Sequence, residues 1–302
     1  MTDDKPVFIK DDKILNPYFA PITELPHHEA LMLLNKSGQS GKLPIDLKKI
    51  CDYEAMPLKF VQIKEENSGA RLRQTKGEWL IEIDSKGTGD DDFSLDQTIR
   101  RWQRFGVSHE LGHYKFKSHC DNNLQVALLS GHNPYAQSYL FQREAQANEF
   151  ATELLLPIPE LKPLLKNLDF RNDFFKSVEN LADQFDTSMT ATLKRVASVL
   201  DIPVIAIHFA PDGKAHQLPS YSKDFKNAGF FFGRNSDIPN NSYAASIFGN
   251  KTTAAKGNKV HQDCSVWFPS RRRDDYKVIE WVFNLGRYGI LVFLELIEKD
   301  NY

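Results

Sequence analysis

The sequence has 302 residues, 41% hydrophobic and 26% charged, a composition typical of a soluble globular protein with about two domains. A net charge of −2 gives no reason to expect affinity of the whole chain for nucleic acid or anionic lipid. The three scattered cysteines form no disulfide framework, no apolar stretch could span a bilayer and the start lacks a signal-peptide layout, so a cytoplasmic protein is expected.

The first part of the chain predicts an extended arm and two short helices. Residues 1–26 carry four prolines and show little periodicity, so they are assigned to an N-terminal extended arm. Apolar residues recur at helical spacing in 29–35 and again in 44–52, where Pro44 stands near the helix start.

Three short segments predict a small antiparallel sheet. Residues 58–64 and 79–84 alternate in part between apolar and polar side chains, and 71–73 can form a third strand. Turn residues Asn67-Ser68-Gly69 stand between the first two segments. An edge of such a sheet could accept an extended peptide as an added strand.

A long helix is expected after the acidic loop at 87–92, which lacks the spacing of a calcium-binding loop. Ser94 begins a capping-box pattern, so the helix is placed from Ser94 to about Phe116. Gly106 and Gly112 lower its helix propensity, but small residues at these positions allow neighbouring elements to approach closely.

This helix contains the motif H-E-x-x-H at His109-Glu110-Leu111-Gly112-His113. Residues four apart lie nearly above one another, so His109 and His113 can bind one zinc ion. Glu110 lies about 100° around the helix, from where it can act as the general base. Two unrelated histidines on a solvated helix face are the alternative, and a third ligand would decide between the two interpretations.

Residues 118–138 are polar and predict a loop between two metal-binding helices, which is a candidate lid over a substrate. His119, His132, Tyr135 and Tyr139 are available there to contact a substrate or to stabilise an oxyanion. The pattern singles out none of the four, because each is equally compatible with a packing role.

The next predicted helix ends at Pro157 and supplies a candidate third ligand. Glu144 shares the apolar face of this helix, and a carboxylate there needs a partner such as a zinc ion. Asn148, one turn further on, can orient a ligating imidazole. Glu149 and Glu153 are placed on the more polar side of the helix and are not chosen.

The two helices resemble those of the ImmA/IrrE-type zinc metallopeptidases. The resemblance covers roughly residues 27–200 and rests on Arg104-Phe105, Ser108-His109-Glu110-Leu111-Gly112-His113-Tyr114, Glu144, Ala147, Asn148, Phe150, Ala151 and Leu154-Leu155-Leu156-Pro157.

This resemblance implies a zinc-dependent endopeptidase with a thermolysin-like core, in which a helix pair packs beside a small sheet. It implies that His109, His113 and Glu144 bind the metal and that Glu110 is the catalytic base. Mn²⁺ or Fe²⁺ could bind the same ligands. Members of the family typically cut repressors of the helix-turn-helix class and so switch on stress-response or mobile-element genes, and the resemblance implies a protein substrate of that kind.

Residues 175–200 predict two helices that resemble a helix-turn-helix, with Asp186-Thr187-Ser188 supplying the N-cap of the second helix. Acidic residues offset the basic ones in this segment, so no electrostatic footprint for DNA is visible. Packing between helices is therefore favoured over DNA binding.

The last third of the chain predicts a mixed α/β domain. Residues 202–210 form a buried strand in this interpretation, and His208 is a hydrogen-bonded strand histidine, not a metal ligand. Further strands are expected at 264–268, 278–284 and 289–297. Proteins similar to IrrE carry a sensor-like domain at this position, but no residues here match it.

The expected fold class is α+β. The expected divisions are an arm at 1–26, a zinc metallopeptidase domain at 27–165, a helix-turn-helix-like segment at 166–200 and a C-terminal α/β domain at 201–302. The alternative to a peptidase is a non-catalytic transcriptional regulator or sensor whose zinc is structural and whose helix-turn-helix or C-terminal domain binds DNA, protein or a ligand. Glu110 favours the enzyme, because a structural zinc site needs no base.

Overall fold

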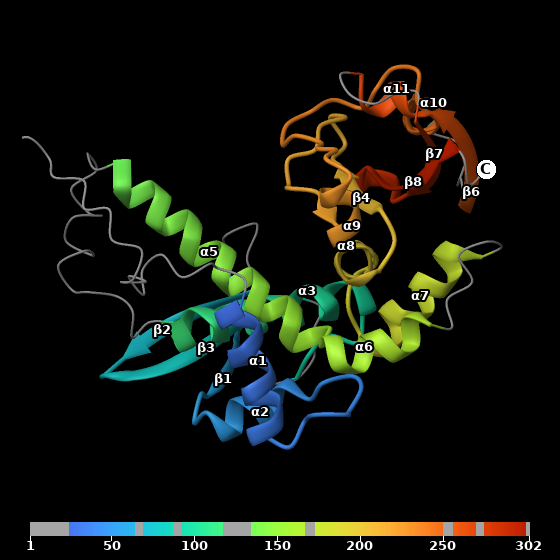
Figure 1. The fold of residues 1–302 in the computed structure, drawn as a ribbon. Helices are drawn as coiled ribbons and strands as arrows, with labels where there is room; N and C mark the ends of the chain where they lie inside the picture. Colours follow the sequence, from blue (N-terminus) through green and yellow to red (C-terminus); the bar gives the residue numbers. More distant parts are fainter. Residues whose placement is uncertain are drawn as a thin grey trace, which may run out of the picture.

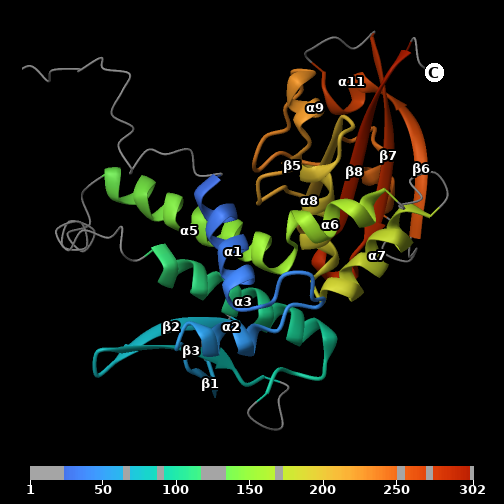
Figure 2. The same cartoon turned by 60° about the horizontal axis from the view of Figure 1, so that its bottom comes forward.

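The computed structural model describes residues 24–63, 69–86, 92–116, 134–166, 173–249, 256–269 and 275–299. Helices surround two sheets, so the α+β fold class is confirmed. A three-stranded sheet lies in one half of the molecule and a five-stranded sheet in the other, and the helices α6, α7 and α8 lie between them (Figures 1 and 2). No helix in these described ranges combines the length and apolar character needed to cross a membrane.

Both short N-terminal helices are present. Helix α1 spans Glu24–Lys36 and is longer than predicted, and α2 spans Leu47–Tyr53. The carboxylate of Asp46 accepts a hydrogen bond from the Lys49 backbone N–H at 3.2 Å and so caps the start of α2. The arm expected at 1–26 lies almost entirely outside the described residues.

The three-stranded sheet is mixed, and the prediction of an antiparallel sheet was wrong in one strand. Strands β2 (Ala70–Thr75) and β3 (Glu78–Asp84) form an antiparallel hairpin, but β1 (Leu58–Val61) pairs with the other side of β3 in parallel. Alternation along a strand indicates which side chains are buried, and this is the same whichever direction the neighbouring strand runs.

Helix α3 spans Gln97–Phe116 and carries the H-E-x-x-H motif. The side chain of Asp96 accepts from the Ile99 N–H at 2.9 Å, so the cap is Asp96 and not Ser94 as predicted. The Ser94 hydroxyl instead accepts from the Asp96 N–H at 3.2 Å. Two consecutive residues with capping side chains make the helix start ambiguous from the sequence.

Helix α5 spans Pro134–Leu155, so the end of the loop predicted at 118–138 is already helical. Pro157 ends α5 as expected, and α6 (Ile158–Leu165) follows at once. One hydrophobic core joins α1, α2, α3, α5 and the three-stranded sheet, and the fully buried Leu111 and Phe150 bring α3 and α5 into it.

Helices α7 (Phe174–Phe185) and α8 (Met189–Val199) form the predicted helix pair. Asp186 adopts a left-handed conformation with φ of 51° and ends α7, while the Ser188 hydroxyl caps α8 by accepting from the Ala191 N–H. Leu181, Phe185 and Val196 pack with α6 in a small core of their own.

The C-terminal sheet is antiparallel, with strand order β5-β4-β8-β7-β6. Its strands are β4 (Val204–Phe209), β5 (Ser220–Tyr221), β6 (Lys256–Asp263), β7 (Tyr276–Asn284) and β8 (Ile290–Glu298). One face packs against α7 and α8, and the other packs against three short helices, α9 (Lys223–Asn227), α10 (Tyr243–Gly249) and α11 (Cys264–Trp267).

The strand predicted at 264–268 was wrong, because those residues form α11. Cys264, Trp267 and Phe268 are all buried, and they are spaced three and four apart. That spacing places them on one face of a helix, so the helical pattern was present in the sequence.

Candidate metal centre

Two glycines of α3 allow this helix to pack closely against the three-stranded sheet on one side and against α5 on the other. A Cβ atom on Gly106 would lie 2.8 Å from the backbone nitrogen of Ala70 in β2, and one on Gly112 would lie 2.9 Å from the Cα of Ala147 in α5. Both distances are too short for a real side chain, so α3 can approach its neighbours only because these positions lack one. The close approach expected from the small residues is therefore confirmed.

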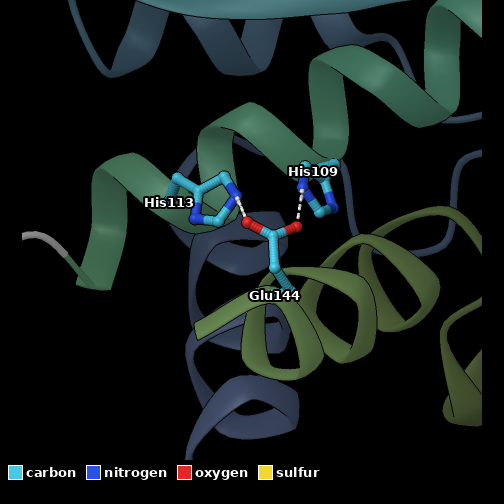
Figure 3. A group of neighbouring side chains, drawn as sticks. All are labelled: His109, His113 and Glu144. Carbon is cyan, nitrogen blue, oxygen red and sulfur yellow. Dashed lines mark ion pairs between the residues drawn. The ribbon is translucent and has the colours of Figure 1, made fainter. Parts of the chain in front are cut away.

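His109, His113 and Glu144 come together across the contact between α3 and α5, as Figure 3 shows. Nε2 of His109 lies 3.2 Å from one carboxylate oxygen of Glu144, and Nε2 of His113 lies 3.2 Å from the other. One ligand atom from each residue falls within 4.8 Å of the others. Two imidazoles and a carboxylate are a donor set that suits a catalytic zinc ion, so the residues fit the metal that the resemblance implies.

A hydrogen bond orients one of the two imidazoles. Nδ1 of His109 donates to the side-chain oxygen of Asn148 at 3.0 Å. With Nδ1 protonated, Nε2 is the ring nitrogen left free to bind a metal, and it is the one that faces Glu144. The structure thus places Asn148 in the orienting position predicted for it.

The other imidazole is kept neutral by its surroundings. Burial, followed by the charge of His109, lowers the pKa of His113 to about 4, although Glu144 acts in the opposite direction. A neutral imidazole is the form that ligates a metal. At neutral pH, His113 therefore needs no deprotonation before it can bind one.

Glu110, the remaining motif residue, contacts the sheet. One of its carboxylate oxygens accepts a hydrogen bond from the backbone N–H of Leu72 in β2 at 3.0 Å. Burial raises the pKa of Glu110 to about 7, the Leu72 N–H lowers it, and the charge of Glu144 raises it further. A carboxylate with a pKa near neutrality can both accept and release a proton at neutral pH.

The contact between Leu72 and Glu110 could not be found from side-chain patterns, because the donor is a backbone group. Among the described strands, β2 pairs with β3 alone, so its other side is a sheet edge. The Leu72 N–H lies on that side and donates to Glu110. The edge expected for peptide binding therefore lies directly beside the candidate base.

The sequence-based assignment of exposed and buried glutamates on α5 was wrong for two residues. The Glu144 side chain is 56% exposed, so it does not point into a core. Glu153, placed on the polar side, is fully buried, where it pairs with Arg195 of α8 and accepts from Nδ1 of His27 at 2.8 Å. These partners, on elements far apart in the sequence, offset the cost of burying the Glu153 carboxylate. The sequence pattern on α5 alone predicts a surface position there.

Most of the predicted loop lies outside the described residues. His119 and His132 lie outside the described residues. The backbone of Tyr135 and Tyr139 is part of α5, but the structure does not describe their side chains.

The helix-turn-helix-like segment is covered by other elements. In α8, Ser198 is the single exposed residue, since one side of the helix faces the C-terminal sheet and another faces α6 and α7. Arg100 and Arg101 of α3 pair with Asp186 and Asp183 of α7 at 2.8 and 2.7 Å. A recognition helix needs an exposed face to enter a groove, so the segment acts as packing, in agreement with the sequence-based preference.

His208 of β4 is also placed as predicted. Its Nε2 lies 2.9 Å from the backbone oxygen of Tyr288, so it is a hydrogen-bonded strand histidine.

Three comparisons with known proteins bear on this site. Residues 100–197 match the family model described as the IrrE N-terminal-like domain (Peptidase_M78). That range begins in α3 and ends in α8, so it includes the H-E-x-x-H motif, Glu144 and most of the helix-turn-helix-like segment. The resemblance to IrrE-type proteins is confirmed, and the match suggests a metallopeptidase.

A search of solved structures finds a similar fold in a Mycobacterium tuberculosis transcriptional regulator, with a TM-score of 0.58 and 12% sequence identity. The alignment covers 90% of this chain and 76% of that one. At this identity the likeness concerns the fold alone. The search of curated proteins gives no match.

Proposed function

We propose that this chain, which carries an IrrE N-terminal-like domain at residues 100–197, is a zinc-dependent endopeptidase that cuts a regulatory protein in the cytoplasm. The observation that carries the proposal is a fourth functional group beside the His109, His113 and Glu144 donors, the separate carboxylate of Glu110. A structural zinc site has no use for such a group, whereas hydrolysis needs a general base.

His109, His113 and Glu144 would hold the metal. When bound, a zinc ion would polarise the peptide carbonyl and increase the acidity of water in the site. Glu110 takes up a proton at the oxygen that the Leu72 N–H leaves free, and returns it to the amine of the departing peptide. Its pKa of about 7 suits both transfers, since a catalytic acid–base group works best near the ambient pH.

The edge of β2 that no described strand pairs with, next to the Leu72 N–H that Glu110 occupies, is the place where a polypeptide substrate would bind. A chain that joins this edge as an added strand passes beside Leu72 and therefore beside Glu110. Main-chain hydrogen bonds to an edge require an extended segment, so the segment that is cut would be a loop or a linker of the substrate.

The proposed substrate rests on the resemblance to the family and on a regulatory role. A regulatory role fits the IrrE-type domain and the fold shared with a protein named as a transcriptional regulator. We assign the substrate to the repressors of the helix-turn-helix class, whose removal by cleavage relieves repression.

Co-expression with candidate repressors tests the function, with metal content measured on the purified chain by emission spectroscopy. The wild type should contain one zinc ion per chain and should produce repressor fragments that mass spectrometry can assign. Glu110→Gln should retain the metal and produce none. The matched control Glu179→Gln, a half-buried position on α7 outside the described site, should behave as the wild type.

The alternative, a regulator that does not cut, predicts a different result. In that case, Glu110→Gln relieves repression as well as the wild type does and the repressor stays intact. That outcome would remove the peptidase proposal and leave a structural metal site.

A further inference from the structure

The edge strand β2 carries two arginines on the face of the sheet that is turned away from α3. Ile81 and Ile83 of β3 are fully buried in the core that α3 shares, so Glu82 between them points to the other face. The register pairs Arg71 of β2 with Glu82, and Arg73 follows two residues later on the same face. Both arginines therefore stand on this outer face, along the strand edge that lies beside the candidate base.

One carboxylate serves both guanidinium groups. Nε of Arg71 lies 2.7 Å from one oxygen of Glu82, and Nη1 of Arg73 lies 3.0 Å from the other. The register places a third cation, Lys59 of β1, opposite Glu82 on its other side. Among the described residues, Glu82 is the carboxylate within ion-pair distance of Arg73. Positive charge therefore exceeds negative charge in this group of four side chains.

Arg73 is the more exposed of the two arginines and retains hydrogen-bond donors. Its side chain is 58% exposed, against 36% for Arg71 and 6% for Glu82. The described bonds from Arg73 to Glu82 use Nη1, and a guanidinium has further N–H donors on Nη2 and Nε. A planar guanidinium with donors of this kind suits a second carboxylate.

The edge of β2 is covered at one end and open at the other. A Cβ atom on Gly106 would lie 2.8 Å from the backbone nitrogen of Ala70, so α3 covers the edge there. Beyond Leu72, whose N–H donates to the candidate base, Gln74 is exposed. A polypeptide that joins this edge therefore pairs with β2 from Leu72 onward, where the next residue is Arg73.

An added strand would place one of its side chains beside Arg73. Directly opposite residues on neighbouring strands have their side chains on the same face, with Cβ atoms about 4.5–5.5 Å apart. The residue opposite Arg73 thus lies beside the guanidinium, while its neighbour opposite Leu72 faces α3.

We propose that Arg73 selects a substrate segment with aspartate or glutamate at the position next to the residue that meets Leu72. The segment that is cut is therefore both extended and acidic. This inference rests on the proposed peptidase function, and it adds a charge requirement to the edge at which the substrate binds.

Peptide binding tests the charge preference without any turnover. The zinc-loaded chain with Glu110→Gln, whose amide oxygen can still accept from the Leu72 N–H, is titrated with three short fluorescein-labelled peptides. These are identical except for glutamate, glutamine or lysine at one central position, and fluorescence anisotropy gives the affinity. The glutamate peptide should bind about two- to fivefold more tightly than the glutamine peptide, and the lysine peptide should bind most weakly. The differences should disappear at about 1 M salt, because screening there acts within about 3 Å.

Variants of Arg73 in the same background locate the preference. Arg73→Gln should bind the three peptides alike with zinc content unchanged, and Arg73→Lys should keep their order. Lys59→Gln removes the same charge from the same face, but on β1 at the far side of Glu82, and should also keep the order. If Arg73→Gln reduces the folded fraction, Arg73→Thr replaces it, since threonine favours a strand.

Three results overturn the inference: a chain that binds the glutamate peptide no better than the glutamine peptide, an uncharged Arg73 variant that keeps the preference, or a Lys59→Gln variant that loses it equally. Each leaves the peptidase proposal intact as long as repressor cleavage depends on Glu110. Conversely, a preference that Arg73→Gln loses, in a protein that cuts no repressor, supports selection by Arg73 and removes the peptidase.

Discussion

Two glutamates with raised pKa values show how differently the two halves of the molecule use a buried carboxylate. Glu110 of α3 accepts one described hydrogen bond, from Leu72, and it stands in the same motif as the two histidines that meet Glu144. Glu280 of the C-terminal sheet is fully buried and accepts from the backbone N–H groups of Tyr243 and Ala244 and from the Trp267 ring.

Burial is the largest cause of the raised pKa in both residues, yet the consequences differ. The oxygens of Glu280 are occupied by donors at the start of α10 and on α11, so the carboxylate joins those helices to the sheet. One oxygen of Glu110 has no described donor and is available for a proton. A raised pKa therefore marks a functional carboxylate only where its oxygens are left accessible.

The largest effect should come from Glu110→Gln, which keeps the side-chain shape and removes the base. We expect kcat to fall about 10²- to 10⁴-fold with zinc content unchanged. Glu280→Gln is the matched control, since the same change at a capped carboxylate should leave kcat within about twofold of the wild type. Cleavage assays on a defined substrate measure both. Equal losses of kcat in the two variants would show that the comparison between the two glutamates is wrong.

Glu144→Ala should separate metal binding from folding. Loss of one of three protein ligands should weaken zinc binding more than 100-fold, beyond the effect of an orienting neighbour. The side chain is 56% exposed, so the unfolding midpoint without metal should change little. Competition with a fluorescent chelator gives the affinity. Unchanged affinity would exclude Glu144 as a ligand.

Asn148→Ala should have a smaller effect on the same site. Without the side-chain oxygen that orients His109, zinc affinity should fall about 10- to 100-fold. Asn148→Asp retains an acceptor for Nδ1 and should recover most of the affinity. If alanine and aspartate behave alike, the hydrogen bond does not orient the ligand.

In the sheet half, Glu280→Leu should lower stability and not activity. The Trp267 and Ala244 N–H groups lose their acceptor, at a cost of about 1–3 kcal/mol in the free energy of unfolding. Urea unfolding monitored by tryptophan fluorescence measures this. A stability equal to that of the wild type would mean that these donors find other acceptors.

The smallest effect is a pH dependence of stability at the same residue. Burial raises the pKa of Glu280 in the folded state above its ordinary value of 4.5, so the native protein holds this proton more tightly than the unfolded chain does. Its contribution to the free energy of unfolding is therefore fully present below pH 4.5 and is lost as the pH rises through the folded pKa. A glutamine at this position cannot ionise, so the Glu280→Gln variant does not lose free energy of unfolding in this way as the pH rises.

The stability of Glu280→Gln relative to the wild type should thus increase as the pH rises from 4.5 through the folded pKa of Glu280, as measured by urea unfolding over a range of pH. A difference that is constant over this range would show that Glu280 does not titrate there.

Much of the candidate site could be predicted because its parts are local. His109 and His113 share a face whenever residues 97–116 are helical, and Asn148 lies one turn from Glu144 by the same rule. Turn-length spacing of this kind depends on the helix and not on what packs against it. Local sequence also predicted the two glycines that permit close approach and the covered helix pair at 174–199.

Tertiary structure alone decided three other features: the direction of β1, the burial of Glu153 and the contact of Leu72 with Glu110. Each depends on a partner distant in the sequence: β3 for the strand, Arg195 for the glutamate, and an edge strand 38 residues away for the base. A periodic pattern shows which face of an element is apolar, but not which element covers it or whether a polar residue finds a partner there. The sequence alone determined that the two histidines and the candidate base share one helix, and packing determined what surrounds them.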